Sequence, residues 1–431
     1  MDLGSESKEF DLVPTKFADT LLYVHTSGTT GLPKAAIIKN SRFMWVGYGV
    51  RRTLGLYKDT EMKETIYTCL PLYHMASAVL ASSQSLMFGT TLAIDSKFSA
   101  SNYWKQAIKY DATIGQYIGE LCRYLLAQPE SKEEKSHRMR KMFGNGVREN
   151  IWDEFKSRFN IDQLVEVYGA TEGNVSTTNI DNHKGACGFI VQSLPRWLMK
   201  KIYPISLIKV DPTTGEVVRD PKSGLCVDVA PGEIGMFVGK IVGDPVRAFD
   251  GYTNPEASKK KIIQDVFVKG DKAYSSGDLL MMDQYGYLYF MDRTGDTFRW
   301  KGENVSTTQV ENVISKIAKE KCCVVYGVQI PGNEGKAGMV AIQDPDKQIN
   351  VNDLLINMKK QLPNYSIPVL IRIVNELEMT PTMKLKKTNL VSDSFHSTGS
   401  DDVYLLDKEQ KKYSIMNKEL YELLKSGNYR L

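Results

Sequence analysis

The sequence has few residues that could build a disulfide framework or a metal centre. Its six cysteines include no CxxC pair, and neither they nor the five histidines show the spacing of a zinc site. We therefore expect reduced, mostly buried thiols in a cytosolic setting, and no zinc. A formal net charge of +4, from 55 basic and 51 acidic residues, is too small to indicate a nucleic-acid partner. It is compatible with a weak attraction to an anionic membrane or to acidic substrates.

Long apolar runs are also lacking. No window reaches the roughly 18 to 20 apolar residues that a membrane-spanning helix needs, and the polar first residues lack the apolar core of a signal peptide. The last residues are not a peroxisomal address of the Ser-Lys-Leu type. We therefore predict no transmembrane segment and no secretion. The length of 431 residues and the 42% hydrophobic content indicate a globular protein of two or more domains.

The sequence does contain a loop suited to a polyphosphate. Residues 26–34, TSGTTGLPK, follow an apolar run at 21–24 that predicts a buried strand. Glycines let backbone N–H groups approach a phosphate, hydroxyls donate to its oxygens and a lysine adds positive charge. The spacing is not that of a Walker A loop, and the alternative is a turn that binds nothing. The candidate nucleotide-binding residues are Thr26, Ser27, Gly28, Thr29, Thr30, Gly31 and Lys34.

Predicted strands and helices alternate from this loop to about residue 168. Strands are expected at 65–70, 91–94, 112–114 and 164–168, and helices at 75–88, 99–110 with Ser99 as N-cap, 120–126 and 151–155. Such repeats predict a doubly wound parallel sheet, which binds ligands at the carboxyl ends of its strands. From residue 203 the segments become β-rich, which favours a small sheet or distorted barrel. A helix capped near Ser306 then opens a small α+β domain.

Three short motifs lie where predicted strands end. A histidine follows the proline that closes one strand, GNG permits close approach of a flat ring, and YGATE offers an aromatic ring, a hydroxyl and a carboxylate for a divalent cation. The alternatives are a structural histidine, an ordinary turn and a turn with one exposed acid. These candidates are His74, Gly144, Asn145, Gly146, Tyr168, Gly169, Thr171 and Glu172.

Two later turns carry charged candidates for a nucleotide site. Asp278 follows a glycine turn and is suited to accept hydrogen bonds from two ribose hydroxyls. Arg293 can reach the ribose, and Gly295 provides backbone freedom for a hinge at residues 293–296. The alternative for the second turn is an exposed turn with paired charges.

A lysine-rich loop lies near the end of the chain. Residues 380–387 read TPTMKLKK, and a mobile lysine there would stabilise negative charge developing on a phosphoryl group. We assign this role to Lys384, with Lys386 and Lys387 as less favoured candidates. The alternative is a basic solvated loop.

Taken together, the phosphate loop and YGATE resemble motifs of the adenylate-forming, or AMP-binding, superfamily. The stretches GELCRYL at 119–125, FDGY at 249–252 and RWKGEN at 299–304 are similar to the fatty acid transport protein and very-long-chain acyl-CoA synthetase family. The resemblance runs from about Asp19 to Leu431. Only 25 residues precede the phosphate loop, whereas in this family a further subdomain with a membrane-anchoring segment precedes it, so we expect the amino-terminal part of the large domain to be missing.

This resemblance implies a domain plan and a cellular setting. A large domain would span residues 1–292, with a β-rich subdomain at about 203–292, and a hinge at 293–296 would lead to a mobile lid domain at 297–431. The implied location is the cytosolic face of the endoplasmic reticulum, a peroxisome or the plasma membrane, with peripheral membrane association. A sheet that lacks strands exposes apolar faces and edges, which favours instability or association into an oligomer.

The resemblance also implies a reaction. A long or very long chain fatty acid and ATP would give an acyl-adenylate and pyrophosphate, and CoA would then give acyl-CoA and AMP, coupled to fatty acid uptake. ATP and Mg²⁺ are the implied cofactors and CoA is the co-substrate, with His74 near the acyl pocket, the metal on Glu172 and Gly302 facing the CoA channel. The implied catalytic residues are Lys384, Glu172, Thr29 and Lys301.

Departures from the family pattern leave an alternative. The loop around Lys384 reads TPTMK where the family reads TGTFK, and Ser77 stands in place of the usual glycine near His74. The alternative is a catalytically weak or inactive component for lipid uptake or lipid binding that retains nucleotide binding. A synthetase for aromatic or small acids is disfavoured by the three narrower stretches.

Overall fold

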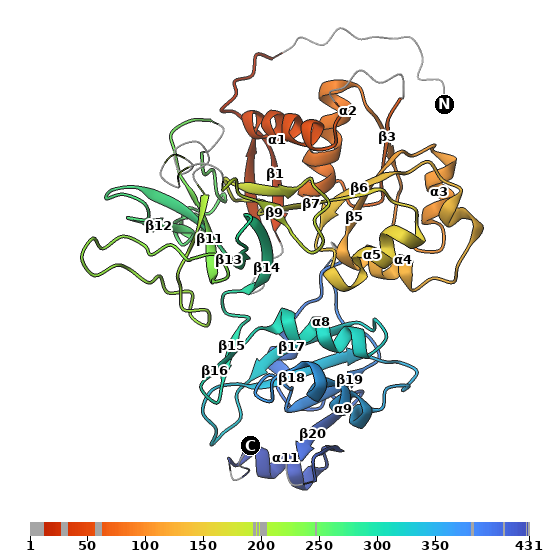
Figure 1. Cartoon of the computed structure of the whole chain (residues 1–431), viewed down its shortest axis with the longest axis vertical. Coiled ribbons are helices and arrows are strands. Elements are labelled where there is room, and N and C mark those ends of the chain that lie inside the picture. Colours follow the sequence, from red (N-terminus) through yellow and green to blue (C-terminus); the bar gives the residue numbers. More distant parts are fainter. Residues whose placement is uncertain are drawn as a thin grey trace.

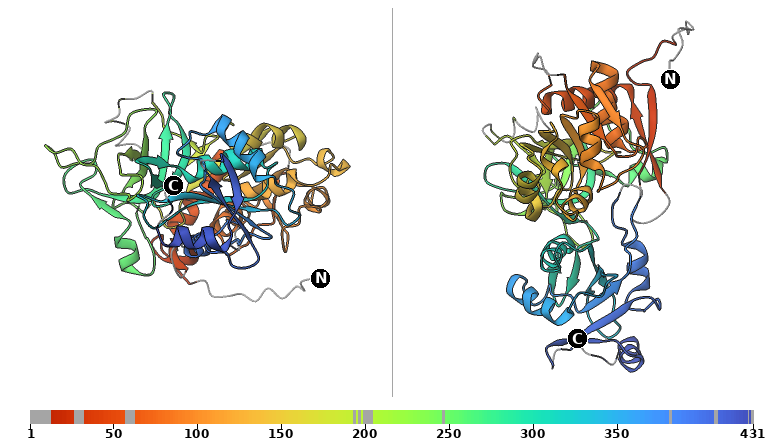
Figure 2. Two further views of the ribbon diagram at one scale, coloured as in Figure 1. Left: turned by 90° about the horizontal axis from the view of Figure 1, so that it is seen from below. Right: turned by 90° about the vertical axis from the view of Figure 1, so that its right-hand side faces the viewer.

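The computed structural model describes residues 13–26, 33–56, 63–192, 195, 198, 205–245, 248–380, 383–407, 410–427 and 429. Its elements form two bodies, which lie one above the other in Figure 1 and can be told apart in the right-hand view of Figure 2. The upper body contains the elements up to β14, and the lower body begins at β15.

A mixed, mainly parallel sheet forms the centre of the upper body. The strand order is β4-β3-β5-β6-β7-β8, and every pair is parallel except β7 with β8. The strands are β3 (Thr65–Thr68), β4 (Thr91–Ile94), β5 (Ile114–Ile118), β6 (Lys141–Asn145), β7 (Gln163–Gly169) and β8 (Ser176–Asn179).

Helices cover both faces of this sheet because adjacent strand residues point to opposite sides. Met142 packs in a cluster with residues of the helices α3 (Tyr103–Lys109), α4 (Gly119–Leu126) and α5 (Glu149–Arg158). Its neighbour Phe143 packs instead with Val50 and Leu54 at the end of the first helix. The other helices of this part are α1 (Asn40–Thr53), the π-helix η1 (Ala76–Ala81), α2 (Ser82–Phe88) and the short 3₁₀ turn η2 (Lys132–Lys135). The predicted doubly wound arrangement is therefore confirmed.

Two predicted helices differ in detail. The helix expected from Ser99 begins at Tyr103 with Asn102 as its N-cap, because residues 99–102 close a turn in which the Asn102 N–H donates to the Ser99 carbonyl at 3.1 Å. The segment predicted as one helix at 75–88 is a π-helix followed by an α-helix.

The strand before the phosphate loop lies outside the parallel sheet. β1 (Thr20–Thr26) pairs antiparallel with β2 (Lys34–Lys39) in a two-stranded sheet. Val24 is buried, but Leu21 is 45% exposed and Tyr23 57% exposed. The prediction of a buried strand is therefore wrong, since neighbouring apolar residues in a two-stranded sheet alternate between its covered and open faces.

An antiparallel sheet follows, with strand order β10-β11-β13-β14-β9 and β12 paired with β13. The predicted β-rich region is confirmed, although β9 precedes residue 203. The strands are β9 (Gly188–Phe189), β10 (Ile205–Ile208), β11 (Ile234–Lys240), β12 (Ile262–Gln264), β13 (Lys272–Met282) and β14 (Tyr287–Arg293), with the helix α7 (Pro255–Lys259) between β11 and β12.

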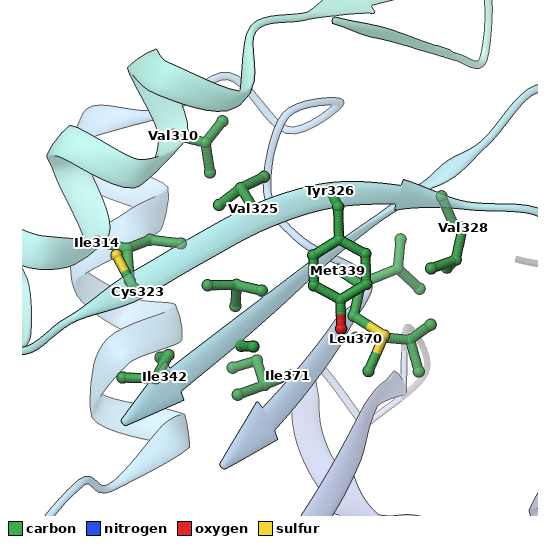
Figure 3. Close-up of a cluster of buried hydrophobic side chains, with 14 of the residues drawn as sticks. Val310, Ile314, Cys323, Val325, Tyr326, Val328, Met339, Ile342, Leu370 and Ile371 are labelled. Carbon is green, nitrogen blue, oxygen red and sulfur yellow. The ribbon is translucent and has the colours of Figure 1, made fainter. Parts of the chain in front are cut away.

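The lower body is a five-stranded sheet with helices. Its order is β17-β18-β19-β20-β21, and β18 and β19 form its parallel pair. Figure 3 shows its core, where Val310 and Ile314 of α8 face Val325 and other buried strand residues. The predicted cap is present, because Ser306 Oγ accepts a hydrogen bond from the Gln309 N–H. The elements are β15 (Phe298–Trp300), β16 (Glu303–Val305), α8 (Thr307–Ile317), β17 (Cys323–Val328), β18 (Ala337–Gln343), α9 (Val351–Gln361), β19 (Leu370–Val374), α10 (Thr388–Asp393), β20 (Asp402–Asp407), β21 (Lys412–Ile415) and α11 (Lys418–Lys425).

Across the described residues, no helix combines the length and the apolar character needed to cross a membrane.

Candidate functional site

The structure describes the residues at the two ends of the phosphate loop. Ser27, Gly28, Thr29, Thr30 and Gly31 lie outside the described residues. Thr26 ends β1 and Lys34 begins β2, and the Thr26 hydroxyl donates to the Lys34 carbonyl at 3.2 Å. The Lys34 ammonium lies 5.6 Å from the centre of the Tyr252 ring. The hairpin therefore places the base of this loop beside the FDGY segment.

Glu172 is a buried acid just beyond the end of β7. It is 7% exposed, its Oε1 accepts a hydrogen bond from the Tyr274 hydroxyl at 3.2 Å, and the Lys261 ammonium lies 3.9 Å away. Gly173 permits this approach, because a Cβ there would come within 2.7 Å of the Tyr274 ring. Burial and the nearby Glu172 carboxylate raise the pKa of Tyr274 well above its usual range. The half-buried Thr171 precedes the acid.

Arg42 is a neighbour of Glu172 that sequence reasoning missed. It lies on α1 and donates to the Ala170 carbonyl at 3.1 Å. Burial lowers its pKa, while Asp250, Tyr274 and Glu172 oppose that effect. No local sequence pattern indicates that Arg42 lies near Glu172, because this proximity arises from the packing of α1 against the turn after β7.

Tyr168, Asp278 and Arg293 meet across two sheets. The Tyr168 hydroxyl donates to Asp278 Oδ2 at 2.8 Å, and Arg293 Nε lies 3.2 Å from Asp278 Oδ1. Asp278 and Arg293 are directly opposite each other on β13 and β14. The Asp278 carboxylate raises the pKa of Arg293, whereas burial is the larger cause that raises the pKa of Tyr168. The structure thus brings these three predicted residues together.

The turn at Gly144, Asn145 and Gly146 is held by close backbone packing. Gly144 and Asn145 are the last residues of β6, and Gly146 has φ of +84°, which favours glycine. A Cβ on Gly144 would lie 2.0 Å from the Tyr117 carbonyl oxygen. Larger residues therefore do not fit where β5 and this turn meet.

Glu166 of β7 supports the same turn and was also missed. Its carboxylate accepts hydrogen bonds from the Gly146 N–H and, at 2.6 Å, from the Tyr117 hydroxyl. It is 5% exposed, and burial raises its pKa to about 7 despite these donors. An acid inside an apolar strand was an available signal, since buried carboxylates are held by specific donors.

Lys384 reaches this region from the lower body. Figure 2 shows the segment between β19 and α10 extending up to the upper body. Surrounding protein atoms lower the pKa of Lys384 by desolvation, Arg293 acts in the same direction, and Asp278 and Glu172 oppose both. Lys384 is nevertheless exposed to solvent, so it is not enclosed in a core. The two acids that act on Lys384, Asp278 and Glu172, both belong to the upper body.

His74 lies near the place where Met383, the residue before Lys384, packs, because Ala76 belongs to the same cluster as Met383. The His74 Nδ1 is 3.5 Å from the Ala76 nitrogen, whose N–H donates to it. Burial lowers the pKa of His74 to about 4, and the Lys384 charge adds to this shift. The imidazole is therefore neutral near pH 7. Ser77 is fully buried and its hydroxyl lies 3.1 Å from Gln116 Oε1, so its side chain points into the sheet.

Lys301 and Gly302 lie elsewhere in this arrangement. They form the exposed turn of the hairpin β15–β16, with φ of +52° and +84°. The Lys301 ammonium lies 5.4 Å from the Trp300 ring, and this hairpin packs against β17 and β18 of the lower body. The structure does not bring them to the region of Lys384.

Comparison with known proteins gives one family match and close relatives. Residues 3–234 match the family model described as AMP-binding enzyme. The chain is 45% identical over 422 residues to human long-chain fatty acid transport protein 1, covering 97% of this chain and 64% of that protein. It is 41% identical to human long-chain fatty acid transport protein 3, covering 97% and 60% respectively. The chain therefore spans less than two thirds of the length of these relatives.

Solved structures share the fold. The ATP-bound MatB of Rhodopseudomonas palustris superposes with a TM-score of 0.68 at 23% identity, covering 89% of this chain and 70% of that one. O-succinylbenzoate coenzyme A synthetase of Bacillus subtilis, in complex with ATP and a magnesium ion, gives 0.67 at 20% identity, covering 90% and 73%. These likenesses extend over both bodies.

Proposed function

The chain belongs to the family of AMP-binding enzymes, and we propose that it is an ATP-dependent ligase that joins a long or very long chain fatty acid to CoA. The first step is attack of the fatty acid carboxylate on the α-phosphorus of ATP, which forms the acyl-adenylate and releases pyrophosphate. In the second step the CoA thiolate attacks the acyl carbon and AMP leaves. The names of the relatives support the acyl class, and two structural neighbours are synthetases or ATP-bound proteins of the same fold.

One observation carries the proposal. Met383, the residue before Lys384 and more than 200 residues from the YGATE motif in sequence, packs on the upper-body cluster that includes Ala76, and from there the Lys384 charge helps to lower the pKa of His74. The first step brings two anions together, so a positive charge beside them stabilises the negative charge that develops on the phosphoryl group. No protein nucleophile is needed, because the mixed anhydride is the activated species.

The remaining residues have roles in binding. Asp278 and Arg293 are proposed to hold the ribose, the turn at 144–146 the adenine, and the phosphate loop with Lys34 the triphosphate. His74 is neutral and its Nε2 is proposed to face the acyl carboxylate. Lys301 and Gly302 are proposed to serve the second step after the lower body, residues 297–431, has rotated about residues 293–296.

Magnesium fits the site through Glu172. The described residues contain no group of three metal-ligating side chains, but Mg²⁺ is commonly held by one or two carboxylates together with substrate phosphates and waters. A single buried acid near the base of the phosphate loop matches that pattern. When bound, the ion neutralises phosphate charge; Glu172 is the proposed protein ligand.

The test is AMP release with palmitate and with a very long chain acid. We expect the wild type to release AMP with at least one acid, and Lys384→Ala to lower that rate by about 100-fold or more while ATP binding persists. Lys386→Ala is the matched control and should stay near the wild-type rate. A wild type that binds ATP but releases no AMP with either acid would contradict the proposal. That outcome favours the alternative, a lipid-binding or uptake component that retains nucleotide binding.

The cellular setting is a proposal of the same kind. The relatives are named as fatty acid transport proteins, and we propose peripheral contact with the cytosolic face of a membrane. Co-sedimentation with anionic vesicles, at low and at high salt, measures this contact. Protein that stays in the supernatant when vesicles and the acyl substrate are both present would contradict the proposal.

A further inference from the structure

The segment that carries Lys384 sends successive side chains to different parts of the molecule. Met383 packs against the cluster formed by the upper sheet and α3, α4 and α5, whereas Leu385 packs against the core of the lower body. The Lys386 ammonium lies 3.8 Å from Glu378, and the Lys387 ammonium donates to the Thr307 hydroxyl at 2.9 Å. Lys384 therefore stands between one residue anchored above it and one anchored below it.

Met383 occupies an unfavourable backbone conformation. Its φ is +55°, in the left-handed region that residues with a Cβ rarely adopt. Such strain persists where the surroundings over-determine the conformation, and it is concentrated at sites of function. The packing of the Met383 side chain on the upper body supplies that constraint.

Hydrogen bonds within the same turn restrain the backbone of Lys384 as well as that of Met383. The Met383 N–H donates to the Thr380 carbonyl at 2.9 Å, and the Lys384 N–H donates to the Thr380 hydroxyl at 3.0 Å. A second contact ties the same segment to α4, because the Tyr124 hydroxyl lies 3.2 Å from the Met379 sulfur. The upper-body cluster that receives Met383 also includes Ala76, two residues after His74.

From this geometry we propose that Met383 is a positioning residue: its side chain docks the lower body on the α3–α5 face of the upper sheet and so holds Lys384, the next residue, at the upper body. The kinetic part of this inference rests on the proposed ligase function. The docking part does not, because it concerns a contact within the chain. Rotation of the lower body requires Met383 to leave the cluster, so the same contact sets how long Lys384 stays in place.

Three variants separate docking from general packing. Met383→Ala removes the side chain that meets the upper body, Met383→Leu retains its bulk, and Leu385→Ala removes an apolar side chain of similar size that meets the lower body instead. Each is made in the full chain. Hydrogen exchange at the amides of Met383 and Lys384 reports docking whether or not the protein is active.

We expect Met383→Ala to speed exchange at those two amides by about tenfold or more, with Met383→Leu and Leu385→Ala near the wild type. The first half-reaction, measured by ATP–pyrophosphate exchange, should fall by about 10- to 100-fold in Met383→Ala. The second, measured from supplied acyl-adenylate and CoA, should change less than about twofold. Leu385→Ala should change both half-reactions in the same proportion.

Two results would overturn the inference. One is a hydrogen-exchange rate at the amides of residues 383 and 384 that is the same in Met383→Ala as in the wild type, which would show that the Met383 side chain does not dock the segment. The other is an equal loss of both half-reactions in Met383→Ala, which indicates a general loss of structure. A wild type without ligase activity but with the predicted exchange pattern contradicts the proposed function and leaves the docking supported.

Discussion

Lys387 forms an ion pair with Asp296, with 3.6 Å between Nζ and Oδ2. The same ammonium lies 3.1 Å from Glu311 Oε1 on α8. Although burial acts in the opposite direction, the Glu311 and Asp296 carboxylates raise the pKa of Lys387. One lysine thus connects the segment after Lys384 to the turn proposed as a hinge and to the first helix of the lower body.

Lys387→Met should destabilise the lower body by about 1–3 kcal/mol, because it leaves two partly buried carboxylates without their cation. The neighbouring Lys386 pairs with Glu378 at the surface, where both side chains are largely exposed. Lys386→Met should therefore change stability by less than about 0.5 kcal/mol. Urea unfolding of the two variants provides the comparison. Equal midpoints would show that the ion pairs of Lys387 with Asp296 and Glu311 contribute no more to stability than a surface pair does.

Asp292 should be the most sensitive polar residue at the junction of the two bodies. It is 2% exposed and accepts hydrogen bonds from the Thr307 N–H at 2.7 Å and the Thr297 hydroxyl at 2.9 Å. Asp292→Asn turns one acceptor oxygen into a donor that faces donors, so we expect a loss of about 2–4 kcal/mol in thermal unfolding. The Thr308 hydroxyl also donates to the Asp292 carboxylate, over a longer distance of 3.4 Å. Thr308→Ala removes this contact and should cost less than about 1 kcal/mol. A loss in Asp292→Asn as small as in Thr308→Ala would contradict this account of the junction.

Glu166 should make stability depend on pH. Its pKa is raised from 4.5 to about 7 in the folded protein, so between those values the folded state holds a proton that the unfolded state has released. The stabilising contribution is therefore complete below about pH 4.5 and is lost as the pH rises through about 7. Relative to Glu166→Gln, the wild type should lose stability on the order of 3 kcal/mol between pH 4.5 and 8.

Urea midpoints of both proteins at several pH values measure this difference. Tyr117→Phe removes the hydroxyl that donates to the Glu166 carboxylate, so it should move the transition to higher pH. A constant difference between wild type and Glu166→Gln across this range would show that the carboxyl does not titrate there.

Glu172→Gln should weaken binding of ATP mainly when Mg²⁺ is present. If the carboxylate holds the ion, its loss should reduce the affinity for Mg·ATP by about tenfold or more and leave binding in EDTA nearly unchanged. Asp250→Asn is a matched control, because Asp250 is a second acid that acts on the pKa of Arg42 and its carboxylate pairs with Lys39. Calorimetric titrations with and without Mg²⁺ measure the effect. An equal loss under both conditions would assign Glu172 a structural role.

Much of the fold was predictable because it depends on local patterns. Apolar runs separated by amphipathic segments predicted the βα repeats, and the turn chemistry before Val310 and Ile314 predicted the capped start of α8. These signals are local, since strand pleat and helix pitch act over a few residues. The phosphate loop and the YGATE motif could also be recognised from the local sequence, although the functions assigned to them stay predictions.

Other features were decided by tertiary contacts. The exposure of Leu21 and Tyr23 follows from the pairing of β1 with β2 in a two-stranded sheet of the described residues. The start of α3 at Tyr103 depends on a turn that competes with the helix. Sequence by itself determined which residues could carry charge, hydroxyls or turn freedom. Only the folded chain decided that Glu166 supports the turn at Gly146 and that Met383 turns upward while Leu385 turns downward, because such choices arise from contacts between residues far apart in the chain.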